Sequence, residues 1–190
     1  MGIRRYNASS DNVITNAFKS NLNDKGTLSN MGSSDVLETF VIHGQTSAAI
    51  NAANAEETRI LVQFPVADIQ SDISNNLLPS QNVTYYLRLY NAQHAETLPE
   101  NFNLDVKILS SSWSEGTGLD IDGYTDIGAS NWISGSTGNA WTTPGGDYHS
   151  LVAANNFSAS VNFLLGNENI ELDVSTAVTN WLDGTKENYG

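Results

Sequence analysis

Apolar and polar residues alternate with a period of two along most of this chain of 190 residues. In the segment ETRILVQF, residues 57–64, Thr58, Ile60, Val62 and Phe64 fall on one face and the other residues on the opposite face. Similar runs occupy residues 12–19, 36–43, 82–91, 104–109, 158–165 and 169–174. This pattern is typical of antiparallel strands that place one face against a core.

Turn residues separate these runs, which predicts an all-β fold, either an antiparallel β-sandwich or a barrel. Two helical segments interrupt the strands. One is PVADIQSDI, with Pro65 at a favourable first position. The other lies near the C-terminus, where Asp173 is expected to cap it and Gly184 to end it. We expect one core between two sheets, formed by Ile60, Val62, Phe64, Val83, Tyr85, Leu87, Leu89, Val161 and Phe163.

No repeat and no linker divides the chain, so we expect an N-terminal arm, 1–11, and a single domain, 12–190. Eight Lys and Arg residues against 21 Asp and Glu residues give a formal net charge of −13. Such a surface repels phosphate, so nucleic acid and anionic membranes are poor partners. The sequence has no cysteine, no secretory signal core and no stretch of transmembrane length. We therefore expect a protein that is kept in the cytosol or assembled there into something larger.

The order of several motifs points to a family. The strand TRILVQFPVADI is followed by LLPSQNVTYYLRLYNA, then by VKILSSSWSEGTG, and finally by IELDVSTAVTNWLDGTKENYG. This order resembles the DNRLRE-type jelly roll, a module similar to carbohydrate-binding modules. The resemblance covers about residues 10–190. In that family an Arg-containing strand leads to a turn, which corresponds to Arg59 and Phe64 here, and a Trp-x-Glu motif follows, which corresponds to Trp113 and Glu115.

The chain departs from the family pattern at two places. Pro65 stands where the family usually has Asp, and Ser175 with Thr176 stands where a single Thr is expected. The resemblance also implies one more apolar strand after the segment NYG, which ends at Gly190. We expect that strand to come from a longer polypeptide or from a partner, because an open sheet edge invites pairing.

The unsignalled start, the acidity and the many Asn and Ser residues further resemble virion structural proteins of tailed phages, especially those of marine bacteria. The resemblance implies a structural or decorating protein of the virion (capsid, neck, tail or fibre), assembled in the host cytoplasm. Other virion proteins or further copies of the chain are the expected partners. The alternative is a glycan-binding module or adhesin domain that recognises cell-surface polysaccharide. No catalytic motif is present, and we predict that the protein is not an enzyme.

Residues 113–146 lack a clear period and hold eight of the 15 glycines and three of the four tryptophans. Long loops of this kind are usually functional or packed on a partner. The aromatic residues Trp132, Trp141, Tyr124 and Tyr148 are candidates for a platform on which sugars stack. The alternative is that these side chains pack the loop onto the sandwich.

The segment GLDIDGYTDIG, residues 118–128, is the best metal-binding candidate. Asp120, Asp122 and Asp126 offer hard oxygen ligands, which suit Ca²⁺. The alternative is a solvated acidic turn, since Asp and Gly are common turn residues.

Overall fold

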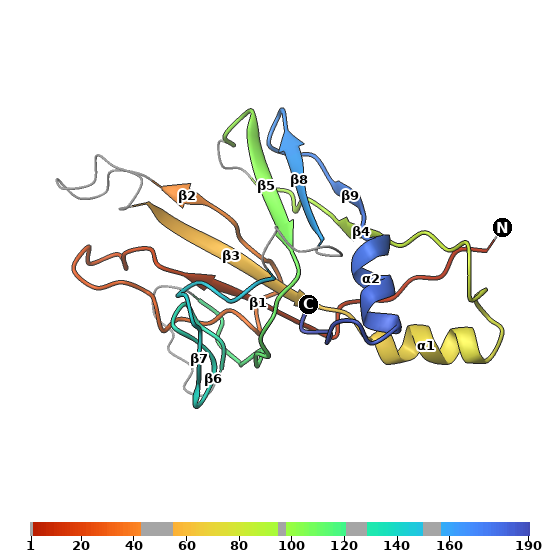
Figure 1. Ribbon diagram of the computed structural model, residues 1–190. Coiled ribbons are helices and arrows are strands. Elements are labelled where there is room, and N and C mark those ends of the chain that lie inside the picture. The colour runs from red at the N-terminus through yellow and green to blue at the C-terminus, as the bar shows by residue number, and fades with distance from the viewer. Residues whose placement is uncertain (1, 43–54, 95–97, 121–128, 150–156) are drawn as a thin grey trace. The chain divides into compact units, whose positions relative to one another are not determined.

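The computed structural model describes residues 2–42, 55–94, 98–120, 129–149 and 157–190. Within this part of the chain the regular secondary structure is mostly β-strand, with two short helices (Figure 1). Each of the seven alternating runs overlaps a strand, and both expected helices are present, so the all-β prediction is confirmed. Neither helix is long and apolar enough to cross a membrane, and the described part of the chain holds no other helix.

The chain forms two compact units, each built from separate segments of sequence. Unit 1 comprises Met1–Phe64, Leu109–Asp147 and Tyr189–Gly190, and unit 2 comprises Pro65–Ile108 and Tyr148–Asn188. The residues that we expected in one shared core are divided between them. Ile60, Val62 and Phe64 belong to unit 1, and the others belong to unit 2.

Unit 1 contains a three-stranded antiparallel sheet in the order β1 (Ser10–Thr15), β3 (Glu56–Gln63) and β2 (Val41–Ile42). Its register pairs Val13 with Ile60 and Ile14 with Arg59. β1 is unusual because four successive residues, Asn12 to Thr15, are buried, so neither face of this strand lies open to water.

The prediction for the inward face of β3 is wrong. The core of unit 1 contains Ile14, Leu61, Leu109, Trp132 and Trp141, with Trp113 and Tyr189 packed against it. Leu61 is therefore the core residue of β3, whereas Ile60, Val62 and Phe64 are only half-buried. Both faces of β3 carry apolar atoms, and the tryptophans of the segment after Leu109 cover the face that bears Leu61.

That segment also contains a short ladder that the sequence did not predict, formed by β6 (Ser134–Ser136) and β7 (Asn139–Ala140). The C-terminal dipeptide belongs to the same unit. The Trp113 indole N–H donates to the Tyr189 carbonyl at 2.7 Å, and the Leu109 N–H donates to the Gly190 carbonyl at 2.8 Å. A Cβ at position 190 would lie 2.2 Å from the Val62 carbonyl oxygen, so glycine is required at this contact.

Unit 2 contains two antiparallel ladders, β4 (Tyr86–Leu89) with β9 (Ile170–Asp173) and β5 (Phe102–Lys107) with β8 (Ser158–Phe163). In the first ladder Leu87 and Ile170 are buried. In the second, the rings of Phe102 and Phe163 stack with centroids 4.8 Å apart. The alternation predicted for these four strands is therefore reproduced in their burial.

The two helices are α1 (Val66–Ser74) and α2 (Ser175–Leu182), both in unit 2. α1 follows Pro65, which has no N–H to donate to a strand and so favours the end of β3. The Asp173 carboxylate accepts the N–H of Ser175 at 2.9 Å, although the N-cap position itself is Val174. The Ser175 hydroxyl accepts the N–H of Tyr85 at 2.9 Å, which ties the start of α2 to the strand segment before β4.

Candidate functional site

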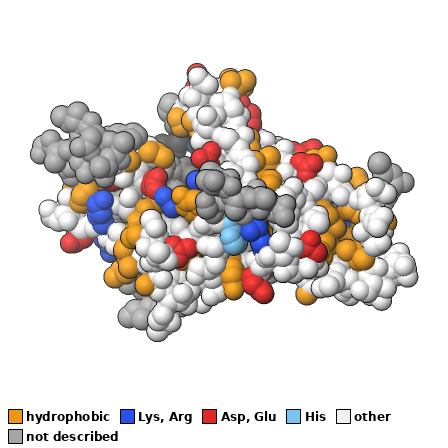
Figure 2. Space-filling view, viewed as in Figure 1, with side chains coloured by type: hydrophobic (Ala, Val, Ile, Leu, Met, Phe, Trp, Pro, Cys, Tyr) orange, Lys and Arg blue, Asp and Glu red, His pale blue; other side chains and the backbone are white. Residues whose placement is uncertain are grey.

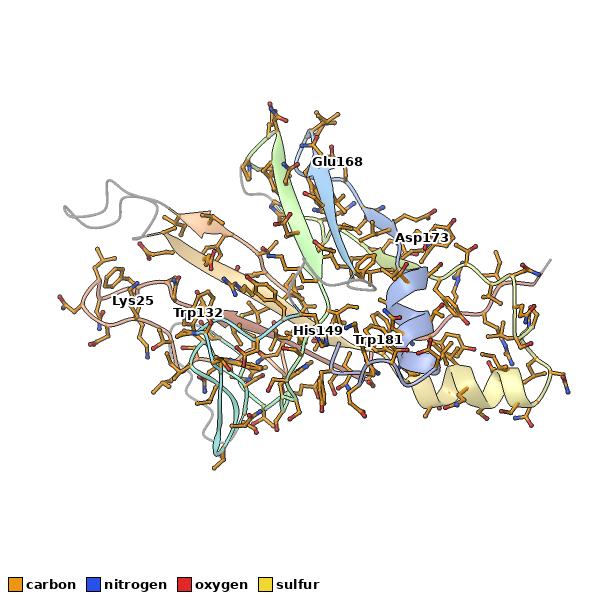
Figure 3. All side chains as sticks on the ribbon, viewed as in Figure 1. Lys25, Trp132, His149, Glu168, Asp173 and Trp181 are labelled. Carbon is orange, nitrogen blue, oxygen red and sulfur yellow. The ribbon has the colours of Figure 1, made fainter. Side chains whose placement is uncertain are left out.

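The two tryptophans predicted to stack on sugars are buried. Trp132 is 6% exposed and Trp141 is 5% exposed, and both belong to the core of unit 1. The Trp141 indole N–H donates to the Asn131 carbonyl at 2.8 Å. Figure 3 shows Trp132 among the side chains of unit 1. The platform prediction is wrong for these two residues because their apolar area covers Leu61 and Ile14, and the packing alternative is confirmed for them.

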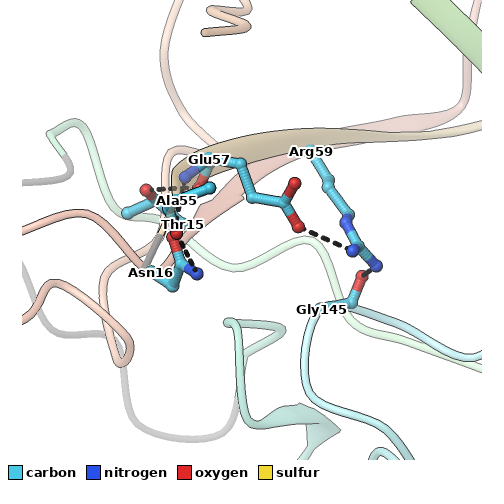
Figure 4. A network of polar contacts seen from close by, with 6 residues as sticks. All are labelled: Thr15, Asn16, Ala55, Glu57, Arg59 and Gly145. Atoms are coloured by element: carbon cyan, nitrogen blue, oxygen red, sulfur yellow. Dashed lines mark hydrogen bonds and ion pairs between the residues drawn. The ribbon is translucent and has the colours of Figure 1, made fainter. Parts of the chain in front are cut away.

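Arg59 holds the loop that contains Gly145 onto the sheet (Figure 4). Its guanidinium donates to the Gly145 carbonyl at 2.8 Å and to the Glu57 carboxylate at 2.7 Å, and it lies over the Trp132 ring at 4.9 Å. Gly145 has φ +98°, and a Cβ there would lie 2.9 Å from the Trp132 ring. The arginine of the family resemblance, Arg59, therefore has a packing role in this structure, with two of its donors bound to Gly145 and Glu57.

The other two aromatic candidates have different outcomes. Tyr148 belongs to unit 2 and is 43% exposed, with the Lys107 ammonium 4.4 Å from its ring centroid. One face of this ring is therefore taken by the lysine. Tyr124 lies outside the described residues.

The predicted calcium site is described in one residue only. Asp120 is exposed and forms an isolated bridge with Asn30, while Asp122 and Asp126 lie outside the described residues. Among the residues that the structure describes, no three His, Cys, Asp or Glu side chains are grouped to hold a metal ion. Calcium binding at these three aspartates stays a prediction.

A buried amide network in unit 1 was not predicted from the sequence. The Asn30 side chain donates to the carbonyls of Glu115 and Ser130 at 2.7 and 2.9 Å. Its oxygen accepts the N–H groups of Gly32 and Gly118 at 2.9 and 3.0 Å.

Asn12 extends this network. Its side-chain amide donates to the Ser130 hydroxyl at 2.7 Å, and its side-chain oxygen accepts the Met31 N–H at 2.8 Å. These donors and acceptors satisfy loop backbone that is buried, which is a structural role.

Asp11 and Glu115 bring two carboxylates together in unit 1. The Asp11 N–H donates to the Glu115 carboxylate at 2.8 Å. Burial, and then the negative charge of Glu115, raise the pKa of Asp11 above its ordinary value of 3.8. Because Glu115 accepts a backbone N–H of the edge strand β1, its position serves the fold, and we assign no proton transfer to this pair.

A hollow of about 520 Å³ lies at the end of α1. Its wall is formed by Ile73, Asn76, Leu77, Leu78, Pro79, Ser80 and Gln81. None of these side chains is ionisable, so this hollow offers no acid–base chemistry.

The outer face of the β4–β9 ladder, with Tyr90 directly after β4, carries exposed aromatic and charged side chains. Tyr86 is 54% exposed and Tyr90 is 72% exposed, whereas Leu87 between them is 8% exposed. The Arg88 guanidinium lies 2.6 Å from the Glu171 carboxylate, and both side chains are about half exposed. The inward Leu87 packs the strand, so this face is presented to solvent on a fixed backbone.

A second exposed feature is the turn between β8 and β9, where Leu164 and Leu165 are each 63% exposed. The Glu168 carboxylate, labelled in Figure 3, accepts the N–H groups of both leucines at 2.8 Å. Gly166 has φ +83°, and a Cβ there would lie 2.4 Å from the Pro99 carbonyl oxygen. The turn therefore holds two exposed leucines in one backbone conformation. We call Leu164 and Leu165 the leucine tip.

Glu168 gives this turn a predictable pH dependence. Backbone N–H groups, first that of Leu165, hold the pKa of Glu168 below its ordinary value of 4.5. The pKa of Glu168 is lower in the folded protein than in the unfolded chain. The ionised Glu168 therefore stabilises the fold fully above its unfolded pKa, and this stabilisation is lost as the pH falls through its folded pKa. In an NMR titration we expect the amide shifts of Leu164 and Leu165 to move below about pH 4.5. In Glu168→Gln these shifts should stay constant, and equal titration in both proteins would contradict the assignment.

The described structure thus defines an all-β protein with two short helices, built as two compact units. No family model, curated protein or solved structure matches the chain. The resemblance to the DNRLRE-type jelly roll therefore remains a prediction from the sequence.

Proposed function

We propose that the protein is a structural component of a larger assembly, a structural or decorating protein of a tailed-phage virion built on a jelly-roll sandwich. The observation that carries this proposal is the leucine tip. Two leucines, each 63% exposed, stand side by side on a turn that Glu168 holds in place. Exposed apolar groups of this kind mark interaction sites, and a rigid turn loses little conformational entropy when it binds.

The charge of the chain opposes non-specific association. A net charge of −13 makes copies of the chain repel one another, so association requires a specific contact such as the leucine tip. Figure 2 shows hydrophobic atoms in separate patches, among side chains that are mostly uncharged or acidic. The expected partners are further copies of this chain or other proteins of the particle, and the expected location is the virion, assembled in the host cytoplasm. We propose no catalytic role.

Self-association tests this function. We expect residues 1–190 to form oligomers in light scattering, because the leucine tip buries apolar area only in a complex. The double variant Leu164→Asn/Leu165→Asn should shift the mass to the monomer. A matched control is Leu28→Asn/Leu77→Asn, which replaces two leucines of similar exposure, 51% and 57%, and should leave the mass unchanged. A tip variant that associates like the wild type would contradict the proposal. A wild-type chain that stays monomeric at every concentration would contradict self-association and leave other proteins of the particle as the partners.

A glycan-binding module or adhesin domain is the second candidate function. Trp132 and Trp141 do not favour it, because they are buried. The exposed Tyr86 of β4 and Tyr90, which directly follows β4, favour it, since an aromatic ring combines an apolar face with a polar edge.

A further inference from the structure

The geometry points to the outer face of the β4–β9 ladder as a binding site for a neutral polysaccharide, with Tyr86 and Tyr90 as its two stacking positions. This inference rests on the glycan-binding candidate function. It names the surface at which the glycan would bind and the class of glycan. It also moves the site away from the tryptophans of the 113–146 loop, which the core of unit 1 uses.

The register of the β4–β9 ladder places the side chains of the proposed site next to one another. Tyr86 pairs with Asp173, and Arg88 pairs with Glu171, in an antiparallel ladder. Directly opposed residues lie on the same face of a sheet, so these four side chains share one face. Exposed and buried residues alternate from Tyr86 to Tyr90: Tyr86, Arg88 and Tyr90 are exposed, Leu87 is buried and Leu89 is half-buried. We call the exposed residues Tyr86, Arg88 and Tyr90, with Glu171 and Asp173 of β9, the strip.

The two tyrosines are spaced for an oligosaccharide. Tyr90 directly follows β4 and is four positions after Tyr86, which corresponds to about 13 Å along an extended chain. One sugar ring cannot contact both aromatic rings at that separation. Two units of a chain that runs along β4 can each contact one ring, so the strip selects a polymer over a monosaccharide.

The polar groups between the tyrosines suit hydroxyl groups. The Arg88 guanidinium supplies donors and the Glu171 carboxylate supplies acceptors, and their separation of 2.6 Å holds them as a pair. Their charges cancel. Asp173 adds a negative charge at one end of the strip, although its carboxylate also accepts the Ser175 N–H. The strip therefore disfavours carboxylated or sulfated glycans and accepts neutral ones.

The acidic side chains of this face favour a sugar over a protein partner. Glu and Asp are depleted at protein interfaces, whereas Tyr and Arg are enriched there. The strip carries two acidic side chains, Glu171 and Asp173, beside Tyr86, Arg88 and Tyr90, and has no aliphatic side chain among them. A protein partner is the outcome that the experiment below separates from glycan binding.

Affinity electrophoresis of the full chain tests the inference, in gels cast with dextran, galactomannan or xyloglucan and, for comparison, anionic alginate. We expect at least one neutral polysaccharide to retard the wild type.

Tyr86→Ala/Tyr90→Ala should weaken that binding at least about tenfold, because both stacking contacts are lost. Tyr86→Phe/Tyr90→Phe should retain most of it, because the rings remain. Tyr148→Ala removes an exposed tyrosine outside the strip and should change nothing. Circular dichroism will show that each variant is folded.

The contrary outcomes are distinct. If a neutral polysaccharide retards the wild type and the double alanine variant equally, the site is wrong while the glycan-binding function stands. If no neutral gel retards the wild type, or if alginate alone does, both the site and that candidate function are wrong, and the assembly proposal is unaffected. If the alanine variant loses self-association while its glycan retardation is unchanged, the strip is a protein interface and the inference is overturned.

Discussion

Trp132→Ala is expected to lower the free energy of unfolding by about 3–5 kcal/mol, the range typical of large aromatic residues removed from a core. Trp132 is 6% exposed, packs with Leu61 and Leu109, and lies beneath the Arg59 guanidinium. Alanine would leave a cavity and remove the surface on which Arg59 lies. Urea denaturation followed by circular dichroism measures the loss without depending on tryptophan fluorescence.

Tyr90→Ala is a suitable control for this measurement, because Tyr90 is an aromatic residue that is 72% exposed. Its cost should stay within about 0.5 kcal/mol, as for most surface substitutions. A Trp132→Ala protein that is as stable as this control would show that the loop is not part of the core of unit 1.

Asn30→Ala is expected to cost at least about 3 kcal/mol, although Asn30 is a polar residue. Its side chain satisfies two buried carbonyls and two backbone N–H groups, those of Glu115, Ser130, Gly32 and Gly118. Each buried group left without a partner costs about 1–3 kcal/mol. The closeness of the backbone leaves little room for rearrangement, since a Cβ at Gly118 would lie 2.0 Å from the Asn30 carbonyl oxygen. Thermal and urea unfolding both report this loss.

An exposed asparagine gives the matched comparison. The Asn162 amide donates to the Phe102 carbonyl and to the Asn103 side chain, at 3.3 and 2.9 Å, and the residue is exposed. Water replaces these bonds in Asn162→Ala, so we expect a change within about 0.5 kcal/mol. Equal losses in Asn30→Ala and Asn162→Ala would show that burial of the Asn30 network is not what makes it important.

The sequence predicted both helices and, among the described residues, every strand except β6 and β7, because these elements depend on local properties. Period-two alternation placed β3, β4 and β8, and the turn residues between runs separated them. Pro65 marked the start of α1, and Asp173 with Gly184 marked the limits of α2. Such signals act within a few residues and need no knowledge of distant contacts.

The sequence was less informative wherever the answer depended on contacts between distant segments. Alternation divides β3 into two faces but does not say which face a distant loop covers, so Leu61 was placed on the wrong side. Trp132 and Trp141 have the composition of a sugar platform and equally that of a core, and only their position over Leu61 and Ile14 decides between the two. In the sequence, Asn30 resembles an ordinary turn residue and Asn12 is the first residue of a predicted strand, so neither indicates a buried network.

What the sequence determined by itself was the two helices and the strands outside the segment 113–146, because alternation and turn chemistry are local. Only the tertiary structure decided which tryptophans are buried, that Arg59 holds the Gly145 loop, and that Asn30 satisfies the backbone of segments about 85 and 100 residues away. It also decided that Tyr86, Arg88 and Tyr90 remain at the surface. The physical reason is that the burial of a side chain and its hydrogen bonds depend on a second segment that is distant in the sequence. Which segments meet is decided by packing over the whole unit.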